Sequence, residues 1–377
     1  MVHIRYIDNS NDFEFCRYAS ACRHRKEFQM QFGHFDDQQR EYVITDPRTP
    51  LPWINYLGSE DFFTLLSNTA GGYCFYRDAR LRRLTRYRYN NCPVDQEGFH
   101  IYIKDGKTVW NPGWQPTKTE LDRYTCRHGL GYSVIEGQKN GVSAAQTLLV
   151  PQGENCLLIR LCLKNETDIK KTLDVFPYVE FCLWDAMDDS SNFQRNFSIG
   201  EVELEPEAIY HKSEYRERRN HYAVLWANRP YDGFDTARDA FIGPYGSPAL
   251  PEAVAAGCCT GSIAHGWAPV GAMQFHLELC PGESQELFFG LGYVENPEGE
   301  KFSAPGVINK TRAHTMIETY RTAAQFDAAA DALRGYWDTL LSNYHAKTGD
   351  EKVDRMVNIW NQYQCMVTFN MSRSASY

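Results

Sequence analysis

The sequence predicts a mainly β fold, a large antiparallel β-sandwich that is followed by helices. Short apolar runs separated by turn residues recur from about residue 33 to 295, as in large sandwiches. Two of the turns contain hairpin dipeptides, Asp105-Gly106 and Asn140-Gly141. Near Pro297 the spacing of apolar residues changes from that of strands to that of helices.

Six further strands are predicted from runs of β-branched, aromatic and other apolar residues. They are Leu157–Leu163, Leu173–Phe181, Ile199–Leu204, Tyr222–Trp226, Met273–Leu279 and Leu287–Tyr293. Glycine and proline between Pro244 and Pro251 predict a surface loop. Residues 1–29 are rich in charge and show no periodicity, so we predict that they are an upstream extension outside the fold.

Helical spacing begins after the sandwich. Val307–Tyr320 and the positions Leu333, Trp337 and Leu341 fit helices. A capping box at Thr348–Glu351 predicts the start of another helix. The apolar face predicted for this helix consists of Val353, Met356, Val357, Trp360, Gln364 and Val367. We expect this face to be exposed in the chain alone and to act as an association site.

Composition narrows the class of protein. The chain has 377 residues, of which 43% are hydrophobic and 14% aromatic, enough for a large buried core. Its net charge of −9 disfavours nucleic acid and anionic membranes as partners. The twelve cysteines form no CxxC pair and no zinc-like spacing with histidine, so no metal site is predicted. The sequence shows no secretory signal and no membrane span, so we expect a cytoplasmic protein.

The most basic stretch, Arg80–Tyr89, alternates arginines with apolar and aromatic residues from Leu84 onward. Such alternation is typical of a half-exposed strand. We interpret the arginines as the solvated face of that strand and not as a nucleic-acid patch.

A polar loop held between two strands is the strongest functional signal. The apolar run Val179–Trp184 leads into an acidic loop, Asp185–Asn192, and then to Gln194 and Arg195. Amides and a guanidinium can pair with sugar hydroxyls while an aromatic face such as Trp184 covers the ring. The alternatives are that Trp184 is a core aromatic and that Arg195 forms a surface ion pair.

Many segments match a known family. In and beside the loop they are Phe181-Cys-Leu-Trp, Asp188-Asp189, Gln194-Arg195-Asn196 and Ser198-Ile-Gly-Glu-Val-Glu203; elsewhere they include Gly33-His-Phe-Asp-Asp37, Pro52-Trp-Ile-Asn-Tyr-Leu-Gly58, Arg127-His-Gly-Leu-Gly-Tyr132 and Met356-Val-Asn-Ile-Trp-Asn-Gln-Tyr-Gln-Cys-Met366. From about residue 30 to its last residue, the chain resembles the N-terminal part of the cellobiose phosphorylase family, which are inverting glycoside phosphorylases.

The resemblance implies a domain order. It places the N-terminal β-sandwich at residues 30–296, a helical linker at 297–345 and the start of an (α/α)6 catalytic barrel, truncated after its first helix, at 346–377. The catalytic aspartate is then expected beyond Tyr377.

The resemblance also implies an activity, a glycosyltransferase reaction that splits cellobiose reversibly into α-D-glucose 1-phosphate and glucose with inversion. Gln194, Arg195, Asn192 and Asp185 are the implied sugar-binding residues, in the chain's own subunit or its partner's. The resemblance leads us to expect asparagine at the position of Asp185. The aspartate found there leaves the identity of the acceptor sugar undetermined. Inorganic phosphate is the implied co-substrate, with no cofactor, and a homodimer is the implied assembly. The alternatives are a phosphorylase of another β-glucosyl disaccharide and a carbohydrate-binding β-sandwich without catalysis.

No residue of the chain itself suits the catalytic acid. Asp36-Asp37 precedes a strand, Asp188-Asp189 lies in a polar loop, and Asp350-Glu351 lies in a helix's first turn, where the dipole favours negative charge. His128 has no nucleophile beside it, so we interpret it as a structural, hydrogen-bonded histidine.

Overall fold

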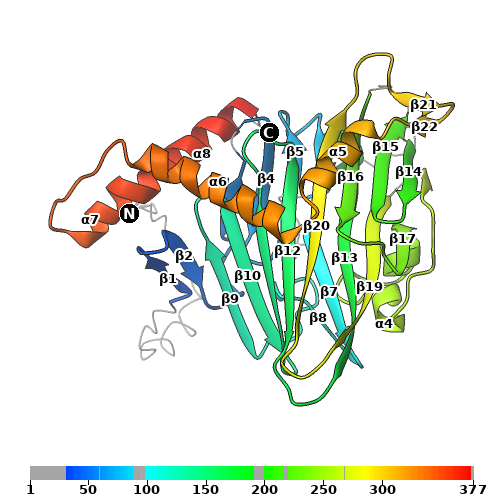
Figure 1. The fold of residues 1–377 in the computed structure, drawn as a ribbon, viewed down its shortest axis with the longest axis horizontal. Coiled ribbons are helices and arrows are strands. Elements are labelled where there is room, and N and C mark those ends of the chain that lie inside the picture. Colours follow the sequence, from blue (N-terminus) through cyan, green and yellow to red (C-terminus); the bar gives the residue numbers. More distant parts are fainter. Residues whose placement is uncertain are drawn as a thin grey trace, which may run out of the picture. The chain divides into compact units, whose positions relative to one another are not determined.

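A computed structural model describes residues 31–58, 60–87, 95, 98–190, 199–214, 220–266 and 268–374. The chain divides into two units, Met1–Phe32 and Gly33–Tyr377. The second unit contains two large antiparallel sheets, so the predicted mainly β fold is confirmed (Figure 1).

The larger sheet has 11 strands and the smaller sheet has nine. In spatial order the larger sheet is β1 (Gly33–Asp36), β2 (Glu41–Ile44), β9 (Arg123–His128), β10 (Tyr132–Lys139), β11 (Val142–Leu149), β12 (Cys156–Asn165), β20 (Ser284–Glu295), β16 (His221–Ala227), β15 (Ala208–Glu214), β14 (Ile199–Glu205) and β18 (His265–Gly266). The smaller sheet is β17 (Gly233–Ala237), β19 (Pro269–Leu279), β13 (Lys171–Trp184), β6 (Arg83–Thr85), β5 (Gly72–Tyr76), β4 (Phe62–Ser67) and β3 (Ile54–Leu57), with β7 (Phe99–Asp105) on β13 and β8 (Thr108–Trp110) on β7.

The two predicted hairpins are present. Asp105 at the end of β7 pairs with Thr108 at the start of β8, and Lys139 of β10 pairs with Val142 of β11. All six further predicted strands lie within observed ones, from β12 to β20. The sequence therefore located these two hairpins and six strands correctly.

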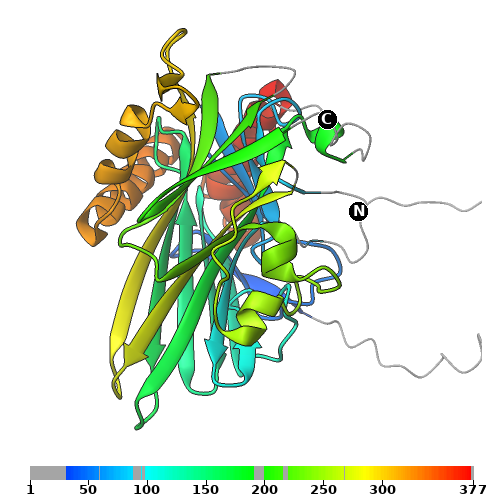
Figure 2. The ribbon, with the colours of Figure 1, turned by 90° about the vertical axis from the view of Figure 1, so that its right-hand side faces the viewer.

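The main core lies between the two sheets. It contains residues from both, among them Leu161 and Leu291 of the larger sheet and Val175 and Phe275 of the smaller one. Strand β13 is buried over almost its whole length, because its other face packs under two short helices, α3 (Arg238–Ile242) and α4 (Glu252–Ala256). Figure 2 shows these helices on the opposite side of the sandwich from α5 (Thr311–Thr319) and α6 (Ala323–Leu341).

A second core joins the larger sheet to the C-terminal helices. These are α5 (Thr311–Thr319), α6 (Ala323–Leu341), α7 (Glu351–Arg355), a π-helical turn η2 (Met356–Trp360) and α8 (Asn361–Ser374); a small hairpin of β21 (Phe302–Ala304) and β22 (Val307–Ile308) precedes them. Helix α6 crosses the outer face of the larger sheet (Figure 1) and buries Leu333, Trp337 and Leu341 there.

Helix α8 is anchored to the sandwich by a buried tyrosine. The Tyr363 hydroxyl lies 2.6 Å from Asn55 Oδ1 and 2.9 Å from the carbonyl oxygen of Tyr56, and it accepts the N–H of Gly131 at 3.3 Å. Asn55 in turn donates to the carbonyl oxygens of Gly129 and Tyr132 at 2.9 and 2.8 Å. The C-terminal helix is therefore fixed to β3 and to the turn before β10.

The expected exposed helix face is only partly present, which corrects the sequence-based prediction. Val353 and Met356 are exposed, but Trp360 and Val367 are buried against the sandwich. The predicted capping box is also different, because Asp350 and not Thr348 caps α7, accepting the N–H groups of Lys352 and Val353.

No helix of the described chain has the length and apolar character needed to cross a membrane.

Candidate functional site

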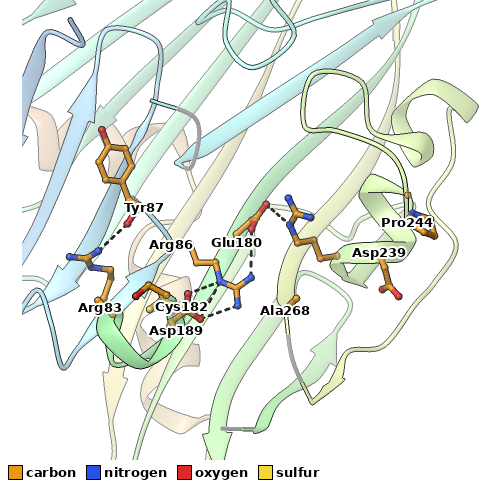
Figure 3. A pocket seen from close by; sticks show the side chains of 13 residues that line it. Arg83, Arg86, Tyr87, Glu180, Cys182, Asp189, Asp239, Pro244 and Ala268 are labelled. Atoms are coloured by element: carbon orange, nitrogen blue, oxygen red, sulfur yellow. Dashed lines mark hydrogen bonds and ion pairs between the residues drawn. The ribbon is translucent and has the colours of Figure 1, made fainter. Parts of the chain in front are cut away.

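The end of β13 opens onto a polar cavity. The cavity measures about 590 Å³ and lies between β13, the short helix α1 (Ala186–Ser190) and α3. Its lining includes six charged side chains: Arg83, Arg86, Glu180, Asp189, Arg238 and Asp239. Figure 3 shows Glu180 and Asp189 on either side of the Arg86 guanidinium.

Helix α1 begins because the backbone turns sharply after β13. Trp184 adopts a left-handed conformation with φ of 68°, which is uncommon for a bulky side chain and directs the chain away from the strand. Asp185 then caps the helix, since its Oδ1 accepts the N–H groups of Met187 at 2.9 Å and Asp188 at 3.1 Å. Asp189 is thereby placed over the end of β13.

Asp189 and Arg86 form a buried bidentate ion pair. Arg86 Nε lies 2.9 Å from Oδ2, and Arg86 Nη2 lies 2.9 Å from Oδ1. The same Oδ1 accepts the N–H of Leu183 at 3.2 Å. Because both side chains are only 7% exposed, this pair holds α1 firmly against the smaller sheet.

Glu180 connects the pair to a second arginine. Its Oε1 accepts hydrogen bonds from Arg238 Nε and from the Tyr178 hydroxyl, each at 2.9 Å, and its Oε2 lies 3.7 Å from Arg86 Nη1. Burial lowers the pKa of Arg86, but the charges and hydrogen bonds of Asp189 and the charge of Glu180 outweigh this and raise it above its usual range. For Arg238 burial is likewise outweighed, mainly by the charge of Glu180, and the pKa is raised.

Arg83 forms the far wall of the cavity. It is buried, donates from Nε to the carbonyl oxygen of Ala79 at 2.8 Å, and its guanidinium carbon lies 4.2 Å from the centre of the Tyr73 ring. Such stacking on an aromatic face stabilises a cation that is shielded from water.

The structure corrects one interpretation of the sequence and decides between the two alternatives left open for Trp184. Arg83 and Arg86 do not form a solvated strand face, because they are only 2% and 6% exposed. Arg83 donates to the carbonyl oxygen of Ala79, and Arg86 pairs with Asp189. Trp184 does not cover a sugar ring, because it is buried in the core beside His211 and His221.

Of the four predicted sugar-binding residues, Asp185 lies in the described part of the chain. It is half-buried at the start of α1, where it acts as the helix cap, and its role toward a sugar stays a prediction. Asn192, Gln194 and Arg195 lie outside the described residues.

His128 has the structural role that was predicted. It closes β9, where Nε2 lies 3.0 Å from the carbonyl oxygen of Trp53 and Nδ1 lies 2.8 Å from the Ser133 hydroxyl. Burial lowers its pKa to about 4. In the part of the chain that the structure describes, no group of three or more His, Cys, Asp or Glu side chains could hold a metal ion.

The cavity suits binding better than proton transfer. Its buried carboxylates already accept several hydrogen bonds from guanidinium groups, while further polar groups of Arg238 and Asp239 face the same space. The pairings of Arg86 and Glu180 were not predicted from the sequence, because Asp189 lies 103 positions from Arg86 and Arg238 lies 58 positions from Glu180. The one available signal was that polar residues interrupt otherwise apolar strands.

Comparison with known proteins assigns the chain to a family. The model of the glycosyl hydrolase 94 supersandwich domain matches residues 40–323. The chain belongs to glycosyl hydrolase family 94. The model of the family 94 catalytic domain matches residues 336–377, after the supersandwich.

Several curated proteins similar to this family 94 chain are named as phosphorylases. It is similar to an N,N'-diacetylchitobiose phosphorylase of Vibrio proteolyticus, with 33% identity over 92% of this chain and 42% of the relative. Another of Vibrio furnissii is 34% identical over the same shares. A 3-O-β-D-glucopyranosyl-β-D-glucuronide phosphorylase of Paenibacillus borealis is 27% identical over 92% and 42%. The chain thus spans about two fifths of the length of these relatives.

Proposed function

We propose that this chain forms the sandwich and the beginning of the catalytic domain of a phosphorylase that splits a β-linked disaccharide with inorganic phosphate and inversion. The observation that supports the proposal best is the succession of the two family 94 models along one chain. The names of the relatives support phosphorolysis and not hydrolysis.

For the disaccharide, N,N'-diacetylchitobiose is now the first choice. Two relatives above 30% identity carry that name, whereas cellobiose, which the sequence resemblance implied, is not the named substrate of the relatives compared. Cellobiose stays the second candidate. Phosphate is the proposed co-substrate, without a further cofactor, and a homodimer in the cytoplasm is the proposed state.

The role proposed for this chain is sugar binding. In inverting phosphorolysis one carboxylic acid protonates the glycosidic oxygen while phosphate attacks the anomeric carbon from the opposite face. Glu180 and Asp189 are each held by arginines, so we assign the acid to another part of the enzyme. The cavity and the loop that follows α1 would then hold and orient the acceptor sugar.

A chimera tests this proposal. Residues 31–377 replace the matching 42% of the Vibrio proteolyticus phosphorylase, and release of sugar 1-phosphate is measured with N,N'-diacetylchitobiose and with cellobiose. We expect phosphate-dependent turnover by the chimera and none by the 377-residue chain alone. A folded, inactive chimera would argue against the proposal, and turnover by the chain alone would place the acid within these residues.

A further inference from the structure

We infer that the cavity between α1 and α3 is a binding site for the hydroxyl groups of an uncharged sugar ring, with Arg238 and Asp239 as its ligand-binding pair. Both side chains line the cavity. The inference concerns residues of α3, whereas Gln194 and Arg195 lie outside the described residues.

The balance of charge in the cavity favours a neutral ligand. Three arginines and three carboxylates line it, so the lining carries no net formal charge. A phosphate or another anion would gain little from such a lining, because its attraction to the arginines is offset by repulsion from the carboxylates. Sugar hydroxyls both donate and accept hydrogen bonds, and they match a lining that offers both kinds of partner.

Arg238 and Asp239 have side-chain polar atoms that are available to a ligand. Arg238 uses Nε for Glu180, and within the described residues neither of its terminal nitrogens donates a hydrogen bond. Asp239 is exposed, and the one described donor to its carboxylate is the N–H of the adjacent Ala240, at 3.1 Å. The terminal guanidinium nitrogens and the carboxylate therefore offer donors and acceptors to neighbouring hydroxyls of one ring.

The site is also preorganised. Glu180 is only 8% exposed and is held by Tyr178 and Arg86, so it fixes the orientation of Arg238 before any ligand arrives. Asp239 is fixed through α3, whose Phe241 stacks on Tyr178 with ring centres 4.7 Å apart. A volume of about 590 Å³ lies within the range of small-molecule sites. Ordering such groups in advance lowers the entropy lost on binding.

Two sources of this sugar are compatible with the chemistry. One is the acceptor sugar of the reaction, an assignment that rests on the proposed function. The other is a distal unit of a longer oligosaccharide, which would not require phosphorolysis. Binding by the chain itself separates these sources without any measurement of activity.

The test titrates the 377-residue chain with N-acetylglucosamine, glucose, cellotetraose and inorganic phosphate, by calorimetry and by saturation-transfer NMR. We expect sugars to bind and phosphate not to bind. Arg238→Ala should weaken sugar binding about tenfold, the loss expected for one charge-assisted hydrogen bond. Asp239→Asn should weaken it less, because the amide keeps one acceptor oxygen.

The matched control is Arg48→Ala. Arg48 is a surface arginine whose side chain is 56% exposed and which pairs with Asp46 and Glu120, so its removal should leave sugar binding unchanged. Arg238→Ala leaves Glu180 with Tyr178 and Arg86 as partners, and Asp239→Asn alters an exposed side chain, so both variants should fold.

The outcomes are separable. Sugar binding that is lost in Arg238→Ala but kept in Arg48→Ala supports the site. Equal affinity for the monosaccharide and the tetrasaccharide would indicate that the site binds a single acceptor ring. Sugar binding that is unchanged in both cavity variants, or binding of phosphate in place of sugar, would overturn the inference. Binding by this chain combined with an inactive chimera would leave the site standing and remove only the proposed activity.

Discussion

Replacing His211 by phenylalanine should make the protein more resistant to acid. His211 lies in β15, is fully buried, and packs nearly parallel to Phe181 and Trp184, with ring centres 4.9 and 6.0 Å apart. Within the described residues neither of its ring nitrogens has a hydrogen-bond partner. Burial, and then the charge of Arg86, lower its pKa from 6.5 to about 3.

The size of the change in stability follows from the linkage between proton binding and folding. Because the pKa of His211 is lower in the folded than in the unfolded protein, the unfolded chain takes up a proton first as the pH falls. The stability present above pH 6.5 is therefore lost progressively between pH 6.5 and about 3. At about 1.4 kcal/mol per pH unit, the loss from this residue is about 2 kcal/mol at pH 5. Phenylalanine keeps the ring packing and has no proton to bind.

Urea unfolding at pH 7.5 and pH 5.0 measures this difference. We expect the free energy of unfolding of His211→Phe, minus that of the parent protein, to be about 2 kcal/mol larger at pH 5.0 than at pH 7.5, so that the variant is the relatively more stable protein in acid. His128 also titrates in this range but is present in both proteins, so its contribution cancels. His276→Gln, a change at a side chain that is 53% exposed, is the control. An identical pH dependence in His211→Phe and the parent would refute the argument.

Three further changes test other contacts by urea unfolding at pH 7.5. Arg86→Met removes the guanidinium that pairs with the buried carboxylate of Asp189 and should cost about 3–5 kcal/mol, part of which a second change, Asp189→Leu, should restore; a cost below 1 kcal/mol would contradict the role of this ion pair. Tyr363→Phe removes the hydroxyl that contacts Asn55 and should cost about 1–3 kcal/mol. An unchanged free energy of unfolding would mean that packing alone anchors α8. Thr322→Ala removes the capping box of α6 and should cost about 1 kcal/mol, whereas an unchanged stability would mean that the cap is replaced by water.

The strands were predictable because their signals are local. The alternation of buried and half-buried residues in β10 and β11, and the Asn140-Gly141 turn between them, are contained within about twenty residues. Positive φ at both turn residues is what this dipeptide permits at low cost. Strand β13, buried on both faces, was found from its continuous apolar run and not from alternation.

The face of the last helix was not predictable from spacing, because the helix changes its period. The turn η2 is π-helical over Met356–Trp360, which adds a residue to one turn and rotates the following positions. Val353 before it is therefore exposed, while Tyr363 and Val367 after it are buried. If the helix continued regularly through η2, Trp360 would lie on the same face as the exposed Val353. The sandwich instead covers Trp360.

The charged cavity shows where sequence reasoning about a site reaches its limit. The alternation of arginines from Leu84 onward predicted a strand, whereas the observed β6 ends at Thr85, just before Arg86. Alternation also cannot tell whether a polar face meets water or another charged element. Here the partner, Asp189, is 103 positions away and arrives only because Trp184 turns the chain and Asp185 starts a helix. Burying an arginine is unfavourable without such a partner, so the pair and the turn that forms it are interdependent. The described part of the predicted polar loop forms the helix α1, and the cavity that α1 helps to line depends on tertiary contacts that no single segment encodes.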